Sequence, residues 1–158
     1  MATSRLLLAV LLLAGTSVAG GGAGPQGSPN SGWLPVSAND DFSYFYNPKS
    51  VTRPGKGKAV AWIKAQAKPA SRDRLRTKYL QYLKDRGVEI EGYKNFSYAM
   101  IQKEFDCAAR KSRLVSVKDY DERGRMLSST YVEDQNWGDV VAGSIEEELL
   151  KIFCKGPK

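Results

Sequence analysis

The sequence predicts an α+β protein with one folded domain. Several segments alternate apolar and polar side chains with the two-residue period of β-strands. Two other segments repeat apolar residues at helical spacing between clear start and stop signals. The 158 residues, 26% of them charged and 42% hydrophobic, are enough to form a globular domain with a buried core.

Two short strands are predicted near the start of the domain. Residues 42–46 alternate aromatic and smaller side chains until an Asn-Pro pair ends the run. After a turn rich in Pro and Gly, residues 59–67 alternate in the same way. One side of this second strand carries Val60, Trp62 and Lys64, and the other carries Ala61, Ile63 and Ala65.

A longer strand is predicted over residues 96–107. Its more apolar side carries Ala99, Ile101, Phe105 and Cys107, with Lys103 as the exception. Its other side carries Tyr98, Met100, Gln102, Glu104 and Asp106. We therefore expect the first of these sides to face the core.

A hairpin is predicted to follow. Residues 114–120 and 126–132 flank an acidic, Gly-containing turn at 121–124. The alternative is a calcium loop that begins at Asp119. Such a loop needs oxygen ligands at its fifth and twelfth positions, where Arg123 and Thr130 stand, so the turn is the better interpretation.

An internal helix is predicted over residues 72–86. Ser71 is placed to cap its N-terminus and Gly87 to end it. The side chains expected to cluster on its buried face are Leu75, Tyr79, Tyr82 and Leu83.

A second helix is predicted at the C-terminal end, over residues 145–154. Ser144 and Glu147 have the spacing of a capping box. The predicted buried stripe is Ile145, Leu149, Ile152 and Phe153. Cys154 falls away from this stripe and beside Leu150, so a bridge from Cys154 needs either a broad buried face or a frayed last turn.

The N-terminal segment predicts export. Residues 1–19 combine Arg5, an apolar run at 6–13 and small residues up to Ala19, which is typical of a cleavable signal peptide and too short to span a bilayer. Residues 20–32, rich in Gly, Pro and Ser, predict a flexible leader before a domain at 33–158. No Cys follows the cleavage site to accept a lipid, so we expect a periplasmic, extracellular or surface-associated protein without lipid anchor or membrane span.

Cys107 and Cys154 are the only cysteines of the chain. In an exported protein two lone cysteines favour a disulfide over two free thiols. The bridge would close a loop of about 47 residues and stabilise the fold by about 4 kcal/mol. The spacing contains no C-x-x-C pair, which argues against redox catalysis.

Composition limits the chemistry further. The chain has no His, which excludes Ser-His-Asp and Cys-His catalysis and most zinc sites, and we expect no cofactor and no metal. An enzyme would have to rely on carboxylates, chiefly Asp40, Asp41, Glu89, Glu91, Glu104, Asp106, Asp119 and Asp121. Glu104 and Asp106 share a strand face about 7 Å apart, but pairing with Arg110 or nearby lysines is favoured over catalysis.

The charge favours acidic partners. The chain has 24 Lys and Arg against 17 Asp and Glu, and loss of Arg5 with the signal peptide leaves 23 basic residues and a net charge of +6. The candidate site for an anion or a partner lies on the internal helix and comprises Arg72, Arg74, Arg76 and Lys78. The alternative is an ordinary solvated basic face. Export argues against nucleic acid as the partner.

The three tryptophans, Trp33, Trp62 and Trp137, each lie within or beside a predicted strand. Core packing is the favoured interpretation over a ligand-binding aromatic patch.

The order of these features resembles the surface-adhesin protein E-like domain of Gram-negative bacteria, over nearly all of residues 33–155. The features that carry the resemblance are Trp33, the aromatic strand Tyr44-Phe45-Tyr46-Asn47, Trp62, the set Glu104, Asp106, Cys107 and Arg110, the hairpin pair Tyr120 and Gly124, Trp137, and the final set Gly143, Ser144, Glu147 and Cys154. The resemblance implies an antiparallel sheet of about six strands packed against the internal helix and a disulfide-tethered C-terminal helix. It also implies dimer formation through the sheet.

The leading functional hypothesis is therefore an exported, non-enzymatic binding or envelope-associated module. Its expected partner is a protein or an anionic glycan or envelope component. The alternatives are a carboxylate-dependent glycan or peptidoglycan hydrolase and a periplasmic assembly protein whose partner pairs with a sheet edge.

Overall fold

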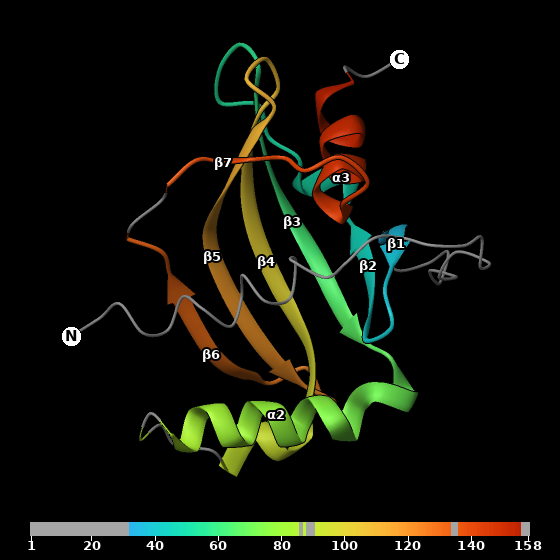
Figure 1. Cartoon of the computed structure of the whole chain (residues 1–158), viewed down its shortest axis with the longest axis vertical. Coiled ribbons are helices and arrows are strands. Elements are labelled where there is room, and N and C mark those ends of the chain that lie inside the picture. Colours follow the sequence, from blue (N-terminus) through green and yellow to red (C-terminus); the bar gives the residue numbers. More distant parts are fainter. Residues whose placement is uncertain (1–31, 86, 88–90, 134–135, 156–158) are drawn as a thin grey trace.

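A single antiparallel sheet organises the computed structural model, which describes residues 32–85, 87, 91–133 and 136–155. Within the described residues the sheet has seven strands in the order β1-β2-β3-β4-β5-β6, with β7 pairing with β5 (Figure 1). The strands are β1 (Leu34–Ala38), β2 (Phe42–Tyr46), β3 (Lys58–Ala67), β4 (Phe96–Asp106), β5 (Lys111–Asp121), β6 (Met126–Tyr131) and β7 (Gly138–Asp139). The helices are α2 (Arg72–Lys84) and α3 (Ile145–Cys154), with short 3-10 turns η1 (Pro48–Ser50), η2 (Pro69–Ser71) and η3 (Glu91–Asn95).

The predicted α+β class, antiparallel sheet and two helices are confirmed. Strand β2 has the predicted bounds, and β3 and β4 differ from prediction by one residue at one end. The hairpin of β5 and β6 also forms, and Gly124 in its turn has a φ of +75°. Asp121 closes this turn by accepting hydrogen bonds from the backbone N–H groups of Arg123 and Arg125, so the turn interpretation is confirmed.

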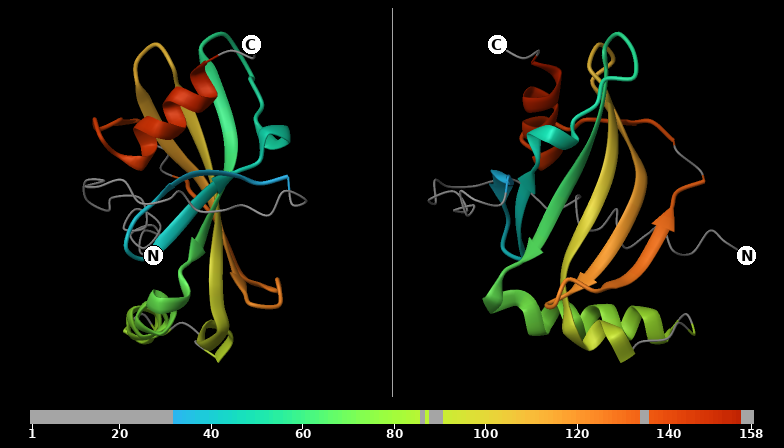
Figure 2. Two further views of the ribbon diagram at one scale, coloured as in Figure 1. Left: turned by 90° about the vertical axis from the view of Figure 1, so that its right-hand side faces the viewer. Right: turned by 180° about the vertical axis from the view of Figure 1, so that it is seen from behind.

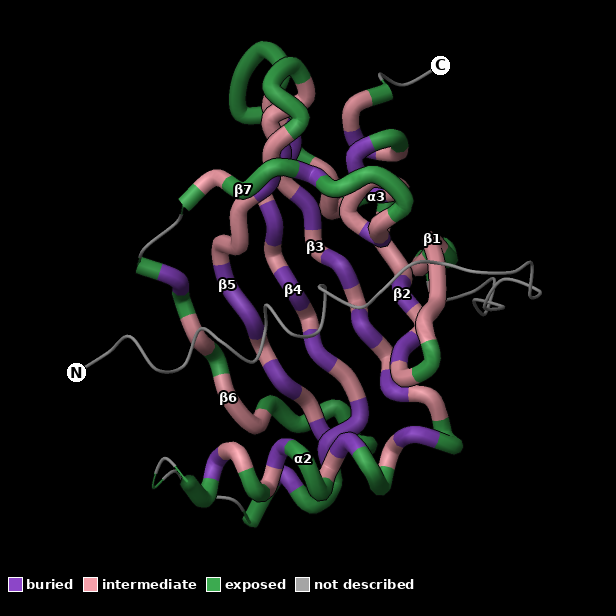
Figure 3. Tube along the Cα trace, viewed as in Figure 1, coloured by how far each residue is buried: buried purple, intermediate pink, exposed green. Residues whose placement is uncertain are grey.

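Both helices pack on the same face of the sheet (Figure 2). On β3 the residues facing them are four alanines and Ile63, all fully or nearly fully buried. On β4, Ile101 pairs in register with Ile63, and Ala99 pairs with Ala65. The two-residue alternation of buried and half-buried residues is visible along β3 and β4 (Figure 3). Small side chains on the covered face let the helices approach the sheet closely.

Helix α3 begins and ends at the predicted residues. The Ser144 side chain caps it by accepting a hydrogen bond from the Glu147 N–H at 3.2 Å. The Glu147 carboxylate accepts from the Gly143 N–H rather than from Ser144, so the capping box is displaced by one residue. Leu150 is buried and Ile152 is only partly buried. The buried face is therefore broad, and this allows Cys154 to reach the sheet.

Helix α2 differs from prediction at both ends. The expected capping role of Ser71 is wrong, because η2 precedes the helix and the Ser71 hydroxyl instead donates to the Asp40 carbonyl at 3.0 Å. The helix ends at Lys84, and Gly87, with a φ of +63°, donates its N–H to the Lys84 carbonyl. The buried residues are Leu75, Tyr79 and Leu83.

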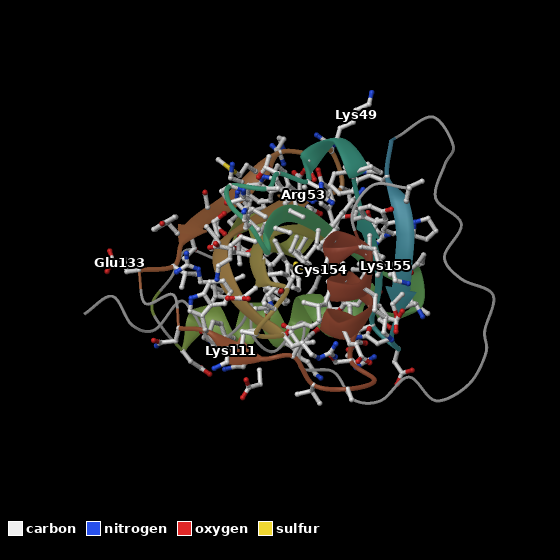
Figure 4. The ribbon with its side chains drawn as sticks, turned by 90° about the horizontal axis from the view of Figure 1, so that it is seen from above. Lys49, Arg53, Lys111, Glu133, Cys154 and Lys155 are labelled. Atoms are coloured by element: carbon white, nitrogen blue, oxygen red, sulfur yellow. A yellow bond between two sulfur atoms is a disulfide. The ribbon has the colours of Figure 1, made fainter. Side chains whose placement is uncertain are left out.

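The disulfide ties α3 to the end of β4. Cys107 and Cys154 are bonded, with their Cα atoms 5.5 Å apart. The Cys107 N–H donates to the Gly57 carbonyl at 2.8 Å, which fixes the turn on the strand side. At the same end of α3, Arg53 donates to the Phe153 carbonyl at 3.2 Å (Figure 4). The predicted bridge is confirmed, and it closes the helix over the sheet.

Lys103, the exception on the apolar side of β4, is 5% exposed and forms an ion pair with Glu146 of α3. Glu146 also accepts a hydrogen bond from the Ser112 hydroxyl at 2.9 Å. Burial lowers the pKa of Lys103, and the neighbouring Glu146 carboxylate opposes this. The start of α3 is thus held to β4 and β5 by a charged contact, and its end by the disulfide.

Replacing Cys107 and Cys154 together with Ser should lower the free energy of unfolding by about 4 kcal/mol, because the loop between them, 47 residues in sequence separation, is no longer closed in the unfolded chain. Urea denaturation measures this difference, and the reduced wild type should match the variant. Alkylation and mass spectrometry should find neither thiol free before reduction. A variant as stable as the oxidised protein would contradict the expectation.

Glu146→Ala should destabilise the fold by about 3 kcal/mol, because it leaves a buried ammonium without its carboxylate. Lys103→Met in the same background should recover most of this loss, since Met fills the site without a charge. Unfolding curves of the two single variants and the double variant form the test. Equal losses in Glu146→Ala and in the double variant would show that the charge of Lys103 is not what Glu146 stabilises.

Candidate binding face

The face of the sheet opposite α2 and α3 carries no helix among the described residues (Figure 2). The outward side chains of β3, β4 and β5 on this side are called the open face. Most are half-buried, and many are aromatic or cationic. The open face comprises Lys58, Val60, Trp62, Lys64, Gln66, Tyr98, Met100, Gln102, Glu104, Asp106, Lys111, Arg113, Ser116, Lys118 and Tyr120.

At one end of the open face, Trp137 lies between two cations. The Lys58 ammonium is 4.2 Å from the centre of the indole ring, and the Arg113 guanidinium is 4.7 Å from it. Both cations are also paired with carboxylates of β4: Lys58 with Asp106 and Arg113 with Glu104, each at 2.5 Å. The positive charge at this end is therefore neutralised.

Lys64 and Lys118 lie further along the open face in a different setting. The Lys64 ammonium is 4.5 Å from the centre of the Tyr98 ring, and the Lys118 ammonium is 5.2 Å from the Trp62 ring. Tyr98 in turn stacks on Tyr120 with the ring centres 4.9 Å apart. Within the part of the chain that the structure describes, neither lysine has a carboxylate within 4 Å. Their charges are thus held in place by rings and are not cancelled.

Register places these two lysines in one row across three strands. Lys64 of β3 pairs with Met100 of β4, and Met100 pairs with Lys118 of β5. Two interstrand steps separate the lysine Cα atoms by about 10 Å. We call Lys64, Met100 and Lys118 the lysine row. Burial lowers the pKa of Lys64, which reflects the cost of withdrawing its charge from water without a counter-charge.

The next row of the open face carries one indole ring and two polar side chains. It consists of Trp62, Gln102 and Ser116, and the Ser116 hydroxyl donates to the Gln102 side-chain carbonyl at 3.3 Å. An amide and a hydroxyl therefore lie beside the lysine row.

The arginines of α2 predicted to bind an anion are engaged with the protein itself. Arg72 and Arg76 both pair with Glu122 in the β5–β6 turn, at 3.0 and 2.6 Å. Hydrogen bonds from Arg76 and the charge of Arg76, with a further contribution from Arg72, lower the pKa of Glu122. Arg76 also donates to the Phe96 carbonyl at 3.1 Å. These contacts fasten α2 to the sheet.

Arg74 and Lys78 complete the predicted set. Arg74 pairs with Asp41 in the β1–β2 turn. Lys78 is exposed on α2 and has no carboxylate within 4 Å among the described residues. The structure therefore does not gather the four predicted side chains into one free cationic cluster. Binding of an anion by this helix stays a prediction.

The expectation that the tryptophans pack in the core is wrong. Trp33, Trp62 and Trp137 are all only partly buried, and Trp62 and Trp137 contact cations of the open face. The sequence held the signal for Trp62, because this residue alternates in phase with Lys58 and Lys64 rather than with the buried alanines. The position of Trp137 depends on the connection around β7, which local periodicity does not reveal.

The carboxylates considered for catalysis are mostly occupied. Glu104 and Asp106 pair with cations as expected, although their partners are Arg113 and Lys58 and not Arg110, which pairs with Glu147. The Ala109 N–H and the Lys58 ammonium lower the pKa of Asp106. Glu89 lies outside the described residues.

Asp119 and Asp121 of β5 are both buried but differ in their surroundings. Burial acts to raise the pKa of Asp121, but hydrogen bonds from Arg125 and Arg123 outweigh it and the pKa is lowered. Asp119 accepts hydrogen bonds from Tyr93 at 2.9 Å and Ser128 at 3.1 Å, yet burial raises its pKa. Burial therefore makes the charged form of Asp119 less favourable than it is in water, and the two hydrogen bonds only partly offset this cost.

The antiparallel sheet, the two helices on one of its faces and the disulfide-tethered C-terminal helix define an α+β domain with one open sheet face. The family model for "Surface-adhesin protein E" matches residues 33–155, so the chain belongs to this family. The family is one of exported or surface proteins, and no helix in the described ranges has the length and apolar character to cross a membrane.

Solved structures of Haemophilus influenzae protein E share the fold. The selenomethionine form superposes with a TM-score of 0.53 at 15% identity, covering 84% of this chain and 92% of that chain. Another structure gives 0.52 at 15%, covering 87% and 91%, and crystal form II gives 0.52 at 14%, covering 89% and 96%. No curated protein sequence matches the chain. At this identity the similarity concerns the fold, and the open face must be assessed from its own residues.

Asp119→Asn should make the protein more stable at pH 7, because Asn keeps a carbonyl that can accept from Tyr93 and carries no charge. Folding raises the pKa of the Asp119 carboxyl group above its value in the unfolded chain. The wild-type protein is therefore most stable below the pKa of the unfolded chain, where the group is protonated in both states, and it loses stability as the pH rises through the pKa of the folded protein. The advantage of the variant should therefore shrink as the pH is lowered toward the ordinary Asp pKa. Urea denaturation across this pH range measures it.

Asp40→Asn provides the matched control, because it makes the same substitution at an exposed position and should change the free energy of unfolding at pH 7 by less than about 0.5 kcal/mol. A constant difference between Asp119→Asn and wild type at every pH would contradict the assigned cause.

Proposed function

We propose that this chain is an exported, non-enzymatic binding module of the bacterial surface or periplasm, and that its partner contacts the open face. Membership of the surface-adhesin family supports a binding role at the surface. The observation that carries the location is the pair Lys64 and Lys118, which are held by aromatic rings but have no carboxylate partner among the described residues. The anion-binding prediction for α2 has weaker support because its arginines already pair with Glu122 and Asp41.

A hydrolytic role has less support than binding. The two carboxylates on the open face are both in ion pairs. Glu104 pairs with Arg113 and Asp106 pairs with Lys58, each at 2.5 Å. Retaining glycoside hydrolysis requires one carboxyl group as nucleophile and one as acid. Carboxylates neutralised by Arg113 and Lys58 are better explained as structural contacts.

The edge of β6 is a second candidate surface. A partner that binds by adding a strand to the sheet needs an exposed edge strand of this kind. Within the described residues β6 pairs with β5 alone, and its ends carry the exposed side chains Met126 and Tyr131, 57% and 66% exposed. The opposite edge is less suited, because β1 contains Pro35 and a register shift beside it. A second copy of the chain pairing at β6 would produce the predicted homodimer.

These surfaces are tested by expressing the full chain and its variants and measuring how tightly each binds to immobilised envelope extract and host-matrix extract. The open-face variant Trp62→Ala/Lys118→Gln should bind about tenfold more weakly or worse, since it removes one aromatic ring and the lysine charge held against it at the centre of the open face. The helix variant Lys78→Gln/Lys84→Gln removes more charge from an exposed surface and should bind like wild type.

An edge variant, Thr130→Lys, separates the second candidate, because a charge on an edge strand opposes strand addition and Thr130 pairs in register with the buried Val117 and not with a residue of the open face. A loss confined to this variant would move the binding surface to β6, and unchanged binding by the open-face variant would reject the proposal. Unfolding midpoints of all variants establish that they are folded.

A further inference from the structure

Lys58, Arg113, Lys64 and Lys118 each lie against an aromatic ring on the open face, but they differ in whether a carboxylate also pairs with them. Lys58 and Arg113 contact Trp137 and are also neutralised by Asp106 and Glu104. Lys64 and Lys118 contact Tyr98 and Trp62 and have no such carboxylate among the described residues. The same face thus contains a neutralised end and a charged centre.

An aromatic ring and a carboxylate hold a lysine with different consequences. A carboxylate removes the net charge of the pair, whereas a ring restricts the ammonium and leaves its charge available. A restricted cation loses less conformational entropy when an anion binds. Lys64 also gains from a counter-charge, because it is partly withdrawn from water and its pKa is lowered by burial.

The geometry sets the kind of anion. The two ammonium groups come from strands two apart, with Cα atoms about 10 Å apart, so one small anion does not bridge them without bending both side chains. A chain with repeated anionic groups reaches both. Met100 lies between the lysines, and the half-buried Gln102 lies in the next row, where its side-chain carbonyl accepts a hydrogen bond from the buried Ser116 hydroxyl. The amide of Gln102 suits hydroxyl groups of a ligand.

We propose that the lysine row and the adjoining Trp62 and Gln102 bind an acidic polysaccharide, with its sulfate or carboxylate groups on Lys64 and Lys118 and its sugar rings and hydroxyls against Trp62 and Gln102. This inference rests on the proposed function, since it names the ligand class of the open face.

The surroundings of the lysine row disfavour two other polyanions. Single-stranded nucleic acid binds by stacking bases on open aromatic faces, but Tyr98 has Tyr120 on one side and is contacted by Lys64. The centre of a protein–protein interface is normally depleted of lysine and enriched in apolar contacts, whereas here lysines stand at the centre of the face. An acidic polysaccharide requires neither feature.

The test measures the dissociation constant of a fluorescent heparin oligosaccharide for the protein expressed from the full chain. Lys64→Gln/Lys118→Gln should weaken binding about tenfold or more, because two charge-assisted contacts are lost. Lys64→Arg/Lys118→Arg should keep binding close to wild type, since the charge is retained. The helix variant Lys78→Gln/Lys84→Gln makes the same change in charge and should weaken binding by less than about twofold.

Several results would overturn the inference. Equal losses in the lysine-row and helix variants would assign the binding to overall charge or to α2, and no loss in the lysine-row variant would exclude this site. Polyphosphate or poly-glutamate bound as tightly as heparin, with the same dependence on Lys64 and Lys118, would remove the preference for sugar. Each variant is compared at matched stability by urea denaturation.

Failure of this inference and failure of the proposed function are distinguishable. If heparin does not bind but Trp62→Ala/Lys118→Gln still loses binding to envelope or matrix extract, the open face binds another class of partner. If that variant keeps its binding to the extracts, the proposal that the partner contacts the open face is rejected.

Discussion

The two-residue alternation along β3 and β4 is the constraint on which the rest of the structure depends. On one side it places alanines and isoleucines, which allow α2 and α3 to lie close to the sheet. On the other side it places Trp62, Lys64 and Tyr98, which are too polar or too large for that helix-packed layer. Covering one face and leaving the other open are therefore consequences of one pattern, because side chains of adjacent residues in a strand point to opposite faces.

The segment with the most basic residues in the sequence is not the part of the molecule with the most unpaired positive charge. The densest cluster, on α2, is largely used to fasten the helix, since Arg72 and Arg76 meet Glu122 and Arg74 meets Asp41. Helix α2 thereby contacts the ends of two separate hairpins. Among the described residues of β3 to β5, Lys64 and Lys118 lack a carboxylate partner within 4 Å. They are 54 positions apart in the sequence and share one row of the sheet only through register.

Local patterns predicted β2 to β6, both helices and the disulfide, because strand alternation, helix periodicity and cysteine pairing are each expressed in short stretches or in composition. They did not predict β1 or β7, which are short and depend on pairing with β2 and β5. They also misassigned Ser71, whose hydroxyl finds Asp40 across the fold, and left Lys103 without an explanation. The ion pairs of the α2 arginines could not be predicted for the same reason: whether a cation is paired depends on partners distant in sequence, such as Glu122 for Arg76.

Lys103 and Lys64 show how the fold separates structural from available charge. Both lie in central strands, Lys103 buried and Lys64 half-buried, and burial lowers the pKa of each. For Lys103, on the covered face, Glu146 provides the counter-charge, so the cost of burial is met within the fold. Lys64, on the open face, has a tyrosine ring in place of a carboxylate. Lys58, on the same face, has Asp106 beside it, so the open face contains both a paired and a ring-held lysine. In the proposed complex the polysaccharide supplies to Lys64 the counter-charge that Glu146 supplies to Lys103.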